Sequence, residues 1–370
     1  MSKRKGFYLL LLSLFLLAII GIEYWTHDYD QYQGTLFKVE DAKIVEKHQE
    51  RDEHGNQDVK AKQQLTGVLL NTKDKGQTLV LSNTYSHSQV YDAKYQVGDI
   101  LLIKRRTLHT GEQSADILSL KRDRLISYCL LVTLFLLALI GNKQGVLSFV
   151  SLIVNTGILV GMTQYYVHTN PQALFKMFVL GAGLFTVVSL VILNGWNRKT
   201  WALILSTLLG TFLSFLISWL AMVMLQQKGI RYEEMDFITK SPHLIFLSGL
   251  LVGCLGAVMD VAMTIITSLE ELLTYQPNLS QKELWQSSQV IGRDIMGPMA
   301  NVLLFAYLSG ALPLILLYLR NDMSYTFTFS MILSLEFIRA VAGSIGIVLT
   351  VPISSWLGIY FFNKLGVTSS

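Results

Sequence analysis

The sequence predicts an α-helical polytopic membrane protein of about eight transmembrane helices with one small extracytoplasmic all-β domain. Hydrophobic residues make up 51% of the 370 residues and charged residues only 15%, against about a quarter charged in soluble domains. The charge is also uneven, because residues 23–124 hold 31 of the 56 charged residues. The rest forms apolar runs near the length of about 20 residues that spans a bilayer.

The first element is a signal-anchor helix within residues 1–22. Lys3, Arg4 and Lys5 precede an apolar stretch from Phe7 to Ile22, and no small-residue cleavage site follows. Because cytoplasmic segments are enriched in Lys and Arg, we expect the basic end to lie in the cytoplasm and residues 23–124 to lie outside it.

Residues 23–124 predict the β domain. Short runs alternate apolar and polar residues in the strand manner, and turn signals such as Lys73–Gly76 separate them. Four to six short strands favour a small antiparallel barrel or sandwich. The polar tract Glu46–Lys62 predicts a long loop or a hairpin tip.

Residues 125–370 predict a bundle of seven further helices. The spans are 125–141, 145–167, 173–194, 201–225, 243–267, 299–319 and 343–362. With the anchor they make eight, so both termini are expected in the cytoplasm. The charge distribution favours this topology, because the segments expected inside hold nine Lys and Arg residues and the short loops expected outside hold four. Residues near 326–342 make the last run too long for one crossing. Glu336 and Arg339 divide that run, which predicts an amphipathic or re-entrant helix in its first half and the last crossing in its second.

The span 243–267 carries its small and polar residues on one helical face, at spacings of three and four. They are Gly249, Gly253, Gly256, Asp260, Thr264, Thr267 and Glu271. Such a face permits close helix packing. Asp260 lies deep in the run, where a charge costs about 2.5–3.5 kcal/mol. This residue predicts a cation or proton site in a transport path, with Thr264 and Thr267 lining it; the alternative is a structural polar contact between helices.

The last span has a similar face, formed by Arg339, Gly343, Gly346, Thr350 and Ser354, with Glu336 one turn earlier. Gly343 and Gly346 are expected to pack against a neighbouring helix. Arg339 has two candidate partners, Asp260 and Glu336. The i,i+3 spacing favours Glu336.

Charged and polar residues near the cytoplasmic ends of the helices are candidates for an inner mouth. They are Glu270, Glu271, Arg293, Asp294 and Asn301. Gly297-Pro298 predicts a break just before the membrane. The alternative is a turn whose charges face water.

Several function classes find no support in the sequence. It holds no phosphate-binding loop, no HExxH, no GxSxG and no GxGxxG, so we expect no enzyme and no cofactor. Its seven histidines and two cysteines stand at no ligand spacing, so we expect no metal. The net charge of +4 forms no basic stripe, which excludes nucleic acid as an expected partner.

Three segments resemble the YibE/F family of bacterial membrane proteins. They run from Gly253 to Glu271, from Gly292 through Gly297 to Asn301 and Tyr307, and from Arg339 through Gly346 to Pro352. The anchor and β domain resemble the longer YibE type. This resemblance implies a bacterial cytoplasmic membrane protein with a YibF-like membrane partner; a homo-oligomer is the alternative. Pro298 and Val302 depart from the threonines of many relatives, which puts a hydroxyl role there in doubt.

Two functions fit these observations. The first is a secondary transporter or channel-like permease for a small solute or ion, with Asp260 as its central charge. The second is a membrane scaffold or accessory subunit that does not transport and whose outer β domain docks an envelope partner.

Overall fold

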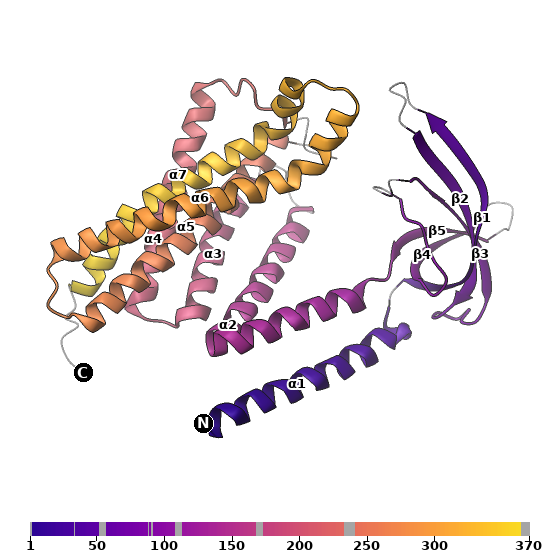
Figure 1. Ribbon diagram of the computed structural model, residues 1–370, viewed down its shortest axis with the longest axis horizontal. Helices are drawn as coiled ribbons and strands as arrows, with labels where there is room; N and C mark the ends of the chain where they lie inside the picture. Colours follow the sequence, from indigo (N-terminus) through magenta and orange to yellow (C-terminus); the bar gives the residue numbers. More distant parts are fainter. Residues whose placement is uncertain are drawn as a thin grey trace. The chain divides into compact units, whose positions relative to one another are not determined.

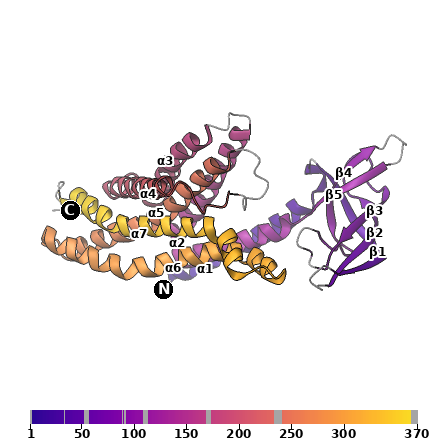
Figure 2. The same ribbon diagram turned by 90° about the horizontal axis from the view of Figure 1, so that it is seen from above.

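The computed structural model describes residues 2–32, 34–51, 57–87, 89, 92–107, 113–167, 173–232 and 241–363. The chain falls into two compact units, residues 1–145 and 146–370, and each is described by itself (Figures 1 and 2). This division differs from the expected boundary at residue 124, since it places the start of the helical region with the β domain.

Unit 1 contains a five-stranded antiparallel sheet. The strands are β1 (Thr35–Arg51), β2 (Gln57–Leu69), β3 (Thr78–Tyr85), β4 (Ile100–Thr107) and β5 (Gln113–Leu120), in the order β3-β2-β1-β4-β5. Bulges in β1 at Val39/Asp41 and Ile44/Glu46 bend that strand, which pairs with both β2 and β4. The sheet is a half-barrel with β3 and β5 at its edges, as the alternating pattern predicts. Most of the tract 46–62 is strand rather than loop, and its tip lies outside the described residues.

The inner face of the half-barrel forms a closed hydrophobic core. Phe37, Leu65 and Leu101 are fully buried there. Gly67 permits the bend of β1 over β2, because a Cβ atom at this position would lie 1.9 Å from the carbonyl oxygen of Lys38. The apolar residues at every second position therefore build the core that the sequence predicts.

Two helices complete unit 1. They are α1 (Ser2–His27) and the first part of α2 (Asp123–Val167), which lie side by side with the rings of Phe15 and Phe135 4.5 Å apart. α2 kinks at Asn142 (φ 48°, ψ −129°). Gly145 permits the kink, because a Cβ atom there would lie 1.9 Å from the carbonyl oxygen of Leu137. The break expected between residues 141 and 145 is thus present.

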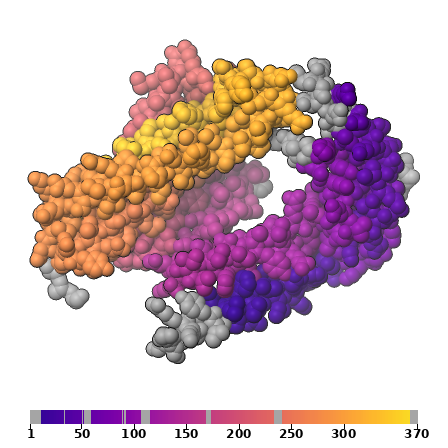
Figure 3. Space-filling model, viewed as in Figure 1, coloured from indigo at the N-terminus to yellow at the C-terminus, as the bar shows by residue number. Residues whose placement is uncertain are grey.

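Unit 2 contains the second part of α2 and five long helices. They are α3 (Ala173–Asn194), α4 (Arg198–Met224), α5 (Pro242–Tyr275), α6 (Gln281–Arg320) and α7 (Tyr325–Asn363). α5 lies at the centre and contacts α3, α4, α6 and α7. α6 lies at the surface, where Figure 3 shows it over the near face of unit 2.

Two expected interruptions in unit 2 are absent. α7 is one continuous helix from Tyr325 to Asn363, so residues 326–342 do not turn back as a re-entrant segment. The pairing of Glu336 with Arg339 explains the continuity, because it satisfies the charges that were expected to divide the run. α6 likewise continues through Gly297, Pro298 and Pro313, since a proline removes one helical hydrogen bond and kinks a helix without always ending it.

Six helices of the described residues are long and apolar enough to cross a membrane, namely α2 to α7. The described apolar part of α1, Leu11–His27, is shorter. Eight crossings are therefore not established. At 40 residues α6 is about 60 Å long and exceeds a hydrocarbon core of about 30 Å, so part of it extends beyond the core of a bilayer that it crosses.

Candidate functional site: an uncovered face of α5

α5 has one face of small and polar residues and three sides of large apolar ones. The small-residue face comprises Gly249, Gly253, Gly256, Asp260, Thr264, Thr267 and Glu271. On the apolar sides Leu251 and Leu255 pack with α3, and Cys254 packs with α4 and α7. With 100° per residue, the small-residue face lies between the contacts with α3 and those with α6.

The small-residue face is uncovered at Gly249 and again from Gly256 to Asp260. A Cβ atom added at Gly249 or Gly256 would meet no atom within 4 Å. The Asp260 side chain is exposed and has no hydrogen bond or ion pair among the described residues. The hydroxyl of Thr264 donates to the backbone carbonyl of Asp260 at 2.9 Å, so it leaves the carboxylate free. Asp260 is therefore open to whatever surrounds α5.

The small-residue face is closed two turns before Asp260. Tyr307 of α6 reaches Gly253, where its hydroxyl oxygen would lie 2.5 Å from an added Cβ atom. Glu336 and Arg339 of α7 lie close enough to Tyr307 to interact with it electrostatically. Glycine at 253 is thus what allows the Tyr307 hydroxyl to approach α5.

Arg339 pairs with Glu336 and not with Asp260. The guanidinium Nη1 lies 2.5 Å from the Glu336 carboxylate, and both side chains are about four-fifths buried. The guanidinium also stacks over the ring of Phe246 at 5.3 Å, a favourable cation–π contact. Among the described residues this neutralised pair leaves Asp260 as the one unpaired charge in the middle of α5.

The glycine face of α7 is packed. A Cβ atom at Gly343 would lie 2.8 Å from Leu303 of α6, and one at Gly346 would lie 2.8 Å from Val258 of α5 and 3.1 Å from the Ser214 hydroxyl of α4. α7 therefore uses its small residues for close helix contacts, in contrast to the open stretch of α5.

The inner-mouth candidates do not form one cluster. Glu270 pairs with Lys199 at the start of α4, at 2.7 Å. Glu271, Arg293, Asp294 and Asn301 are exposed, and Arg293 and Asp294 have no ion pair within the described ranges. The structure thus brings Glu270 into a helix-to-helix contact and leaves the others at the surface.

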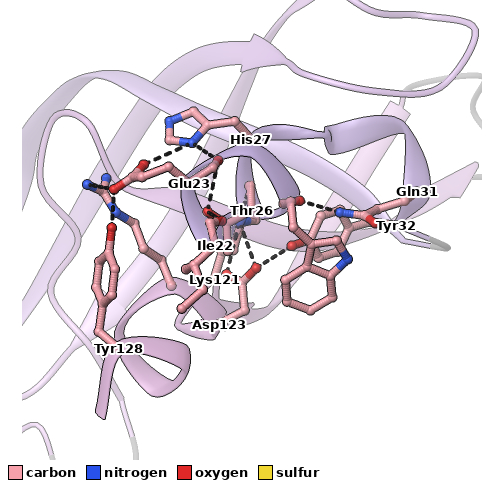
Figure 4. Close-up of polar contacts among 11 residues, drawn as sticks. Ile22, Glu23, Thr26, His27, Gln31, Tyr32, Lys121, Asp123 and Tyr128 are labelled. Carbon is pink, nitrogen blue, oxygen red and sulfur yellow. Dashed lines mark hydrogen bonds and ion pairs between the residues drawn. The ribbon is translucent and has the colours of Figure 1, made fainter. Parts of the chain in front are cut away.

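A second polar cluster lies in unit 1, where α1, the end of β5 and the start of α2 meet (Figure 4). The Lys121 ammonium, 8% exposed, donates to the carbonyl of Thr26 at 2.7 Å and to Asp123 at 2.9 Å. The Tyr32 hydroxyl also donates to Asp123. Burial and this hydrogen bond raise the pKa of Tyr32 well above its usual value, so the hydroxyl remains a donor at neutral pH.

The same junction has an outer layer around Glu23 of α1. Its carboxylate accepts from the Tyr128 hydroxyl and pairs with Arg124 at 2.6 Å. Together the two layers fasten α1 and the start of α2 to the base of the sheet. Asp123 Oδ1 is buried without a hydrogen bond and lies 2.9 Å from the Lys121 ammonium. Because the charged groups pair with one another inside unit 1, we interpret this cluster as structural rather than as a binding site.

No group of three or more His, Cys, Asp or Glu side chains that could hold a metal ion occurs among the residues the structure describes.

The residues expected in the transport path fall into two separate groups. Asp260 and Thr264 share one face, whereas Glu336 and Arg339 form their own pair at α7.

Sequence reasoning missed three residues. Tyr307 and Lys199 contact residues far away in the chain, and no local pattern marks them. Lys121 is one of the many charges of residues 23–124, which the sequence predicts to be solvated, whereas it is the buried centre of the junction. The sequence signal available for Lys121 was its place between a strand and a helix beside Asp123.

Comparison with known proteins gives two family matches. A model described as YibE/F-like protein matches residues 129–364, and one described as YibE/F family N-terminal domain matches residues 30–120. No curated protein and no solved structure matches the chain.

Proposed function

The chain belongs to the YibE/F-like family, and on that basis we propose that this membrane protein is a secondary transporter or channel-like permease for a small solute or ion. Six long apolar helices and the family match support the membrane part of this statement. The transport part rests on Asp260, and neither an enzymatic activity nor a cofactor belongs to the proposal.

The observation that carries the proposal is an exposed carboxylate in the middle of α5 without a partner among the described residues. Such a charge costs about 2.5–3.5 kcal/mol in hydrocarbon. Water, a bound cation or a proton removes this cost. A water-filled path along Gly256, Asp260 and Thr264 supplies all three, because the small side chains leave room beside α5.

Tyr307 and the pair Glu336–Arg339 serve as the gate of this path. Tyr307 meets α5 at Gly253, two turns from Asp260, where its hydroxyl occupies the space that a side chain would fill. Glu336 and Arg339 lie close enough to Tyr307 to interact with it electrostatically. A displacement of α6 away from α5 would open this end. Gly343 and Gly346 keep α7 packed during such a motion, since they contact α6, α5 and α4 closely.

We propose that the protein lies in the bacterial cytoplasmic membrane. In this topology both termini lie in the cytoplasm, α1 is the signal anchor and the β domain lies outside. The distribution of Lys and Arg supports this orientation. A YibF-like membrane partner or a second copy of the chain completes the assembly.

The test is flux through the purified protein in liposomes, with H⁺, Na⁺ and K⁺ as probes. Asp260→Asn and Asp260→Ala are expected to reduce flux about tenfold or more, because both remove the charge from the path. Glu40→Gln, at an exposed carboxylate on β1, is the control and should keep wild-type flux. Unchanged flux in folded Asp260 variants would refute the assignment of the site.

The β domain supports a second function, a scaffold that does not transport and that docks an envelope partner. The edge strands β3 and β5 have no further strand in the described sheet. A groove of about 650 Å³ beside them is lined by polar residues that include Asn83, Asp92 and Arg122. An extended segment of a partner could pair with such an edge. Membrane pull-downs should then recover a partner in stoichiometric amount. Leu118→Lys on β5 should abolish the recovery of that partner.

A further inference from the structure

α4 and α7 enclose an apolar groove near the C-terminal end of α4. The groove has a volume of about 380 Å³. Most of its wall is apolar, with Ala221 of α4, Leu225 directly after α4, and Phe337 and Val341 of α7 among the lining residues. None of its lining residues is acidic.

The groove results from the way the two helices diverge. In the middle of the bundle they touch, since the Ser214 hydroxyl donates to the carbonyl of Ala342 at 2.6 Å. Toward the end of α4 the groove lies between the two helices. The backbone N–H of Arg231 then donates to the Ser334 hydroxyl at 3.3 Å and joins the turn after α4 to α7. The groove is therefore bounded at both ends.

A cation stands at one end of the groove. Lys228 lines it and, with Arg231, is exposed and has no ion pair within the described part of the chain. Two other cations of unit 2 do have carboxylate partners, namely Lys199 with Glu270 and Arg339 with Glu336. Lys228 follows the 27 residues of α4, which are about 40 Å long, so it lies where the helix leaves a hydrocarbon core of about 30 Å.

A second apolar groove adjoins the first. It has a volume of about 520 Å³, lies between α6 and α7 and is lined by Ala300, Leu304 and Val348 among others. Phe337, Val341 and Ile345 line both grooves. These three residues thus form a ridge on α7 with an apolar groove on either side.

We propose that the two grooves and Lys228 form a binding site for an anionic phospholipid of the bilayer. One acyl chain lies in each groove, on either side of the α7 ridge, and the phosphate of the headgroup contacts Lys228. Apolar walls suit the acyl chains, and a lysine at the interface attracts anionic headgroups. This site is separate from the small-residue face of α5 and does not depend on transport.

The experiment measures lipid binding to the purified full-length protein by native mass spectrometry, with dioleoyl phosphatidylglycerol and dioleoyl phosphatidylcholine as probes. The wild type is expected to prefer phosphatidylglycerol. Lys228→Gln should reduce that preference about fivefold, the value of one basic residue near a charged surface. Lys282→Gln, at an exposed lysine of α6, is the matched control and should keep it.

A second variant tests the grooves. Ala221→Trp fills the first groove and is expected to weaken binding of both lipids, because it excludes an acyl chain whatever the headgroup. An unchanged phosphatidylglycerol preference in Lys228→Gln would overturn the headgroup contact. Unchanged binding of both lipids in Ala221→Trp would overturn the site.

Discussion

Gly292 of α6 is the position where the packing of the bundle can be tested most sharply. A Cβ atom there would lie 2.2, 2.9 and 3.1 Å from the Cγ1, Cγ2 and Cβ atoms of Val351 on α7. Val351 is 2% exposed, and its branched side chain has few rotamers into which it could move. Gly292→Ala therefore forces α6 and α7 apart by about 1 Å, and overpacking of this kind costs about 1–3 kcal/mol.

The gain in helix propensity from glycine to alanine, about 1 kcal/mol, offsets part of this cost. We expect Gly292→Ala to lower the free energy of unfolding by up to about 2 kcal/mol. The matched control is Gly256→Ala on α5, where an added Cβ atom meets nothing within 4 Å. That variant should raise stability by about 0.5–1 kcal/mol.

The assay is reversible unfolding in mixed micelles followed by circular dichroism. Val351→Ala alone should destabilise by about 2 kcal/mol through the cavity it leaves. In the double variant the new methyl group occupies space that the Val351 side chain vacated. The double variant should therefore lose about 1–3 kcal/mol less unfolding free energy than the sum of the two single variants. Equal stability of Gly292→Ala and Gly256→Ala, or strict additivity in the cycle, would refute the close contact between α6 and α7.

Three further predictions concern unit 1. Asn71→Ala should destabilise the sheet by about 3 kcal/mol, because the Asn71 amide accepts from Leu36 N–H at 2.8 Å and donates to Gly34; slower or unchanged hydrogen exchange at Leu36 would contradict this. Lys121→Met should cost about 2 kcal/mol, since it leaves the Asp123 carboxylate without its ammonium partner, and thermal unfolding of the full chain would measure the loss. Asn142→Gly should stabilise by about 1 kcal/mol and Asn142→Val destabilise by about 2 kcal/mol, because φ is positive there; the same stability in both variants would argue against the kink.

The order of elements could be predicted because each rests on a local pattern. Alternation of apolar residues gives the strands, and apolar runs give the helices. Local signals were less informative about interruptions. Glu336 and Arg339 suggested a division of α7, whereas their mutual pairing lets the helix continue. Pro298 suggested a break in α6, whereas the helix passes through it.

For the candidate site, the sequence could predict only that its residues share one face of a helix. The spacing from Gly249 to Glu271 places small and polar residues together, and the structure places them on one side of α5. The same spacing on α7 proved to be a packed contact at Gly346, while α5 is open at Gly256. Spacing shows that a neighbour can approach a helix and not whether one does, because that depends on residues such as Tyr307 elsewhere in the chain.

Access of water to the α5 face decides between a transport path and a dry membrane scaffold. The measurement is the rate at which a membrane-impermeant thiosulfonate modifies Gly256→Cys in intact membranes, in a chain that carries Cys129→Ser because Cys129 is exposed. Val302→Cys, 63% exposed on α6, is the matched position facing lipid. We predict rapid modification of Gly256→Cys and little of Val302→Cys, since thiolates form in water and not in hydrocarbon. Equally slow modification at both positions would contradict a wet path to Asp260.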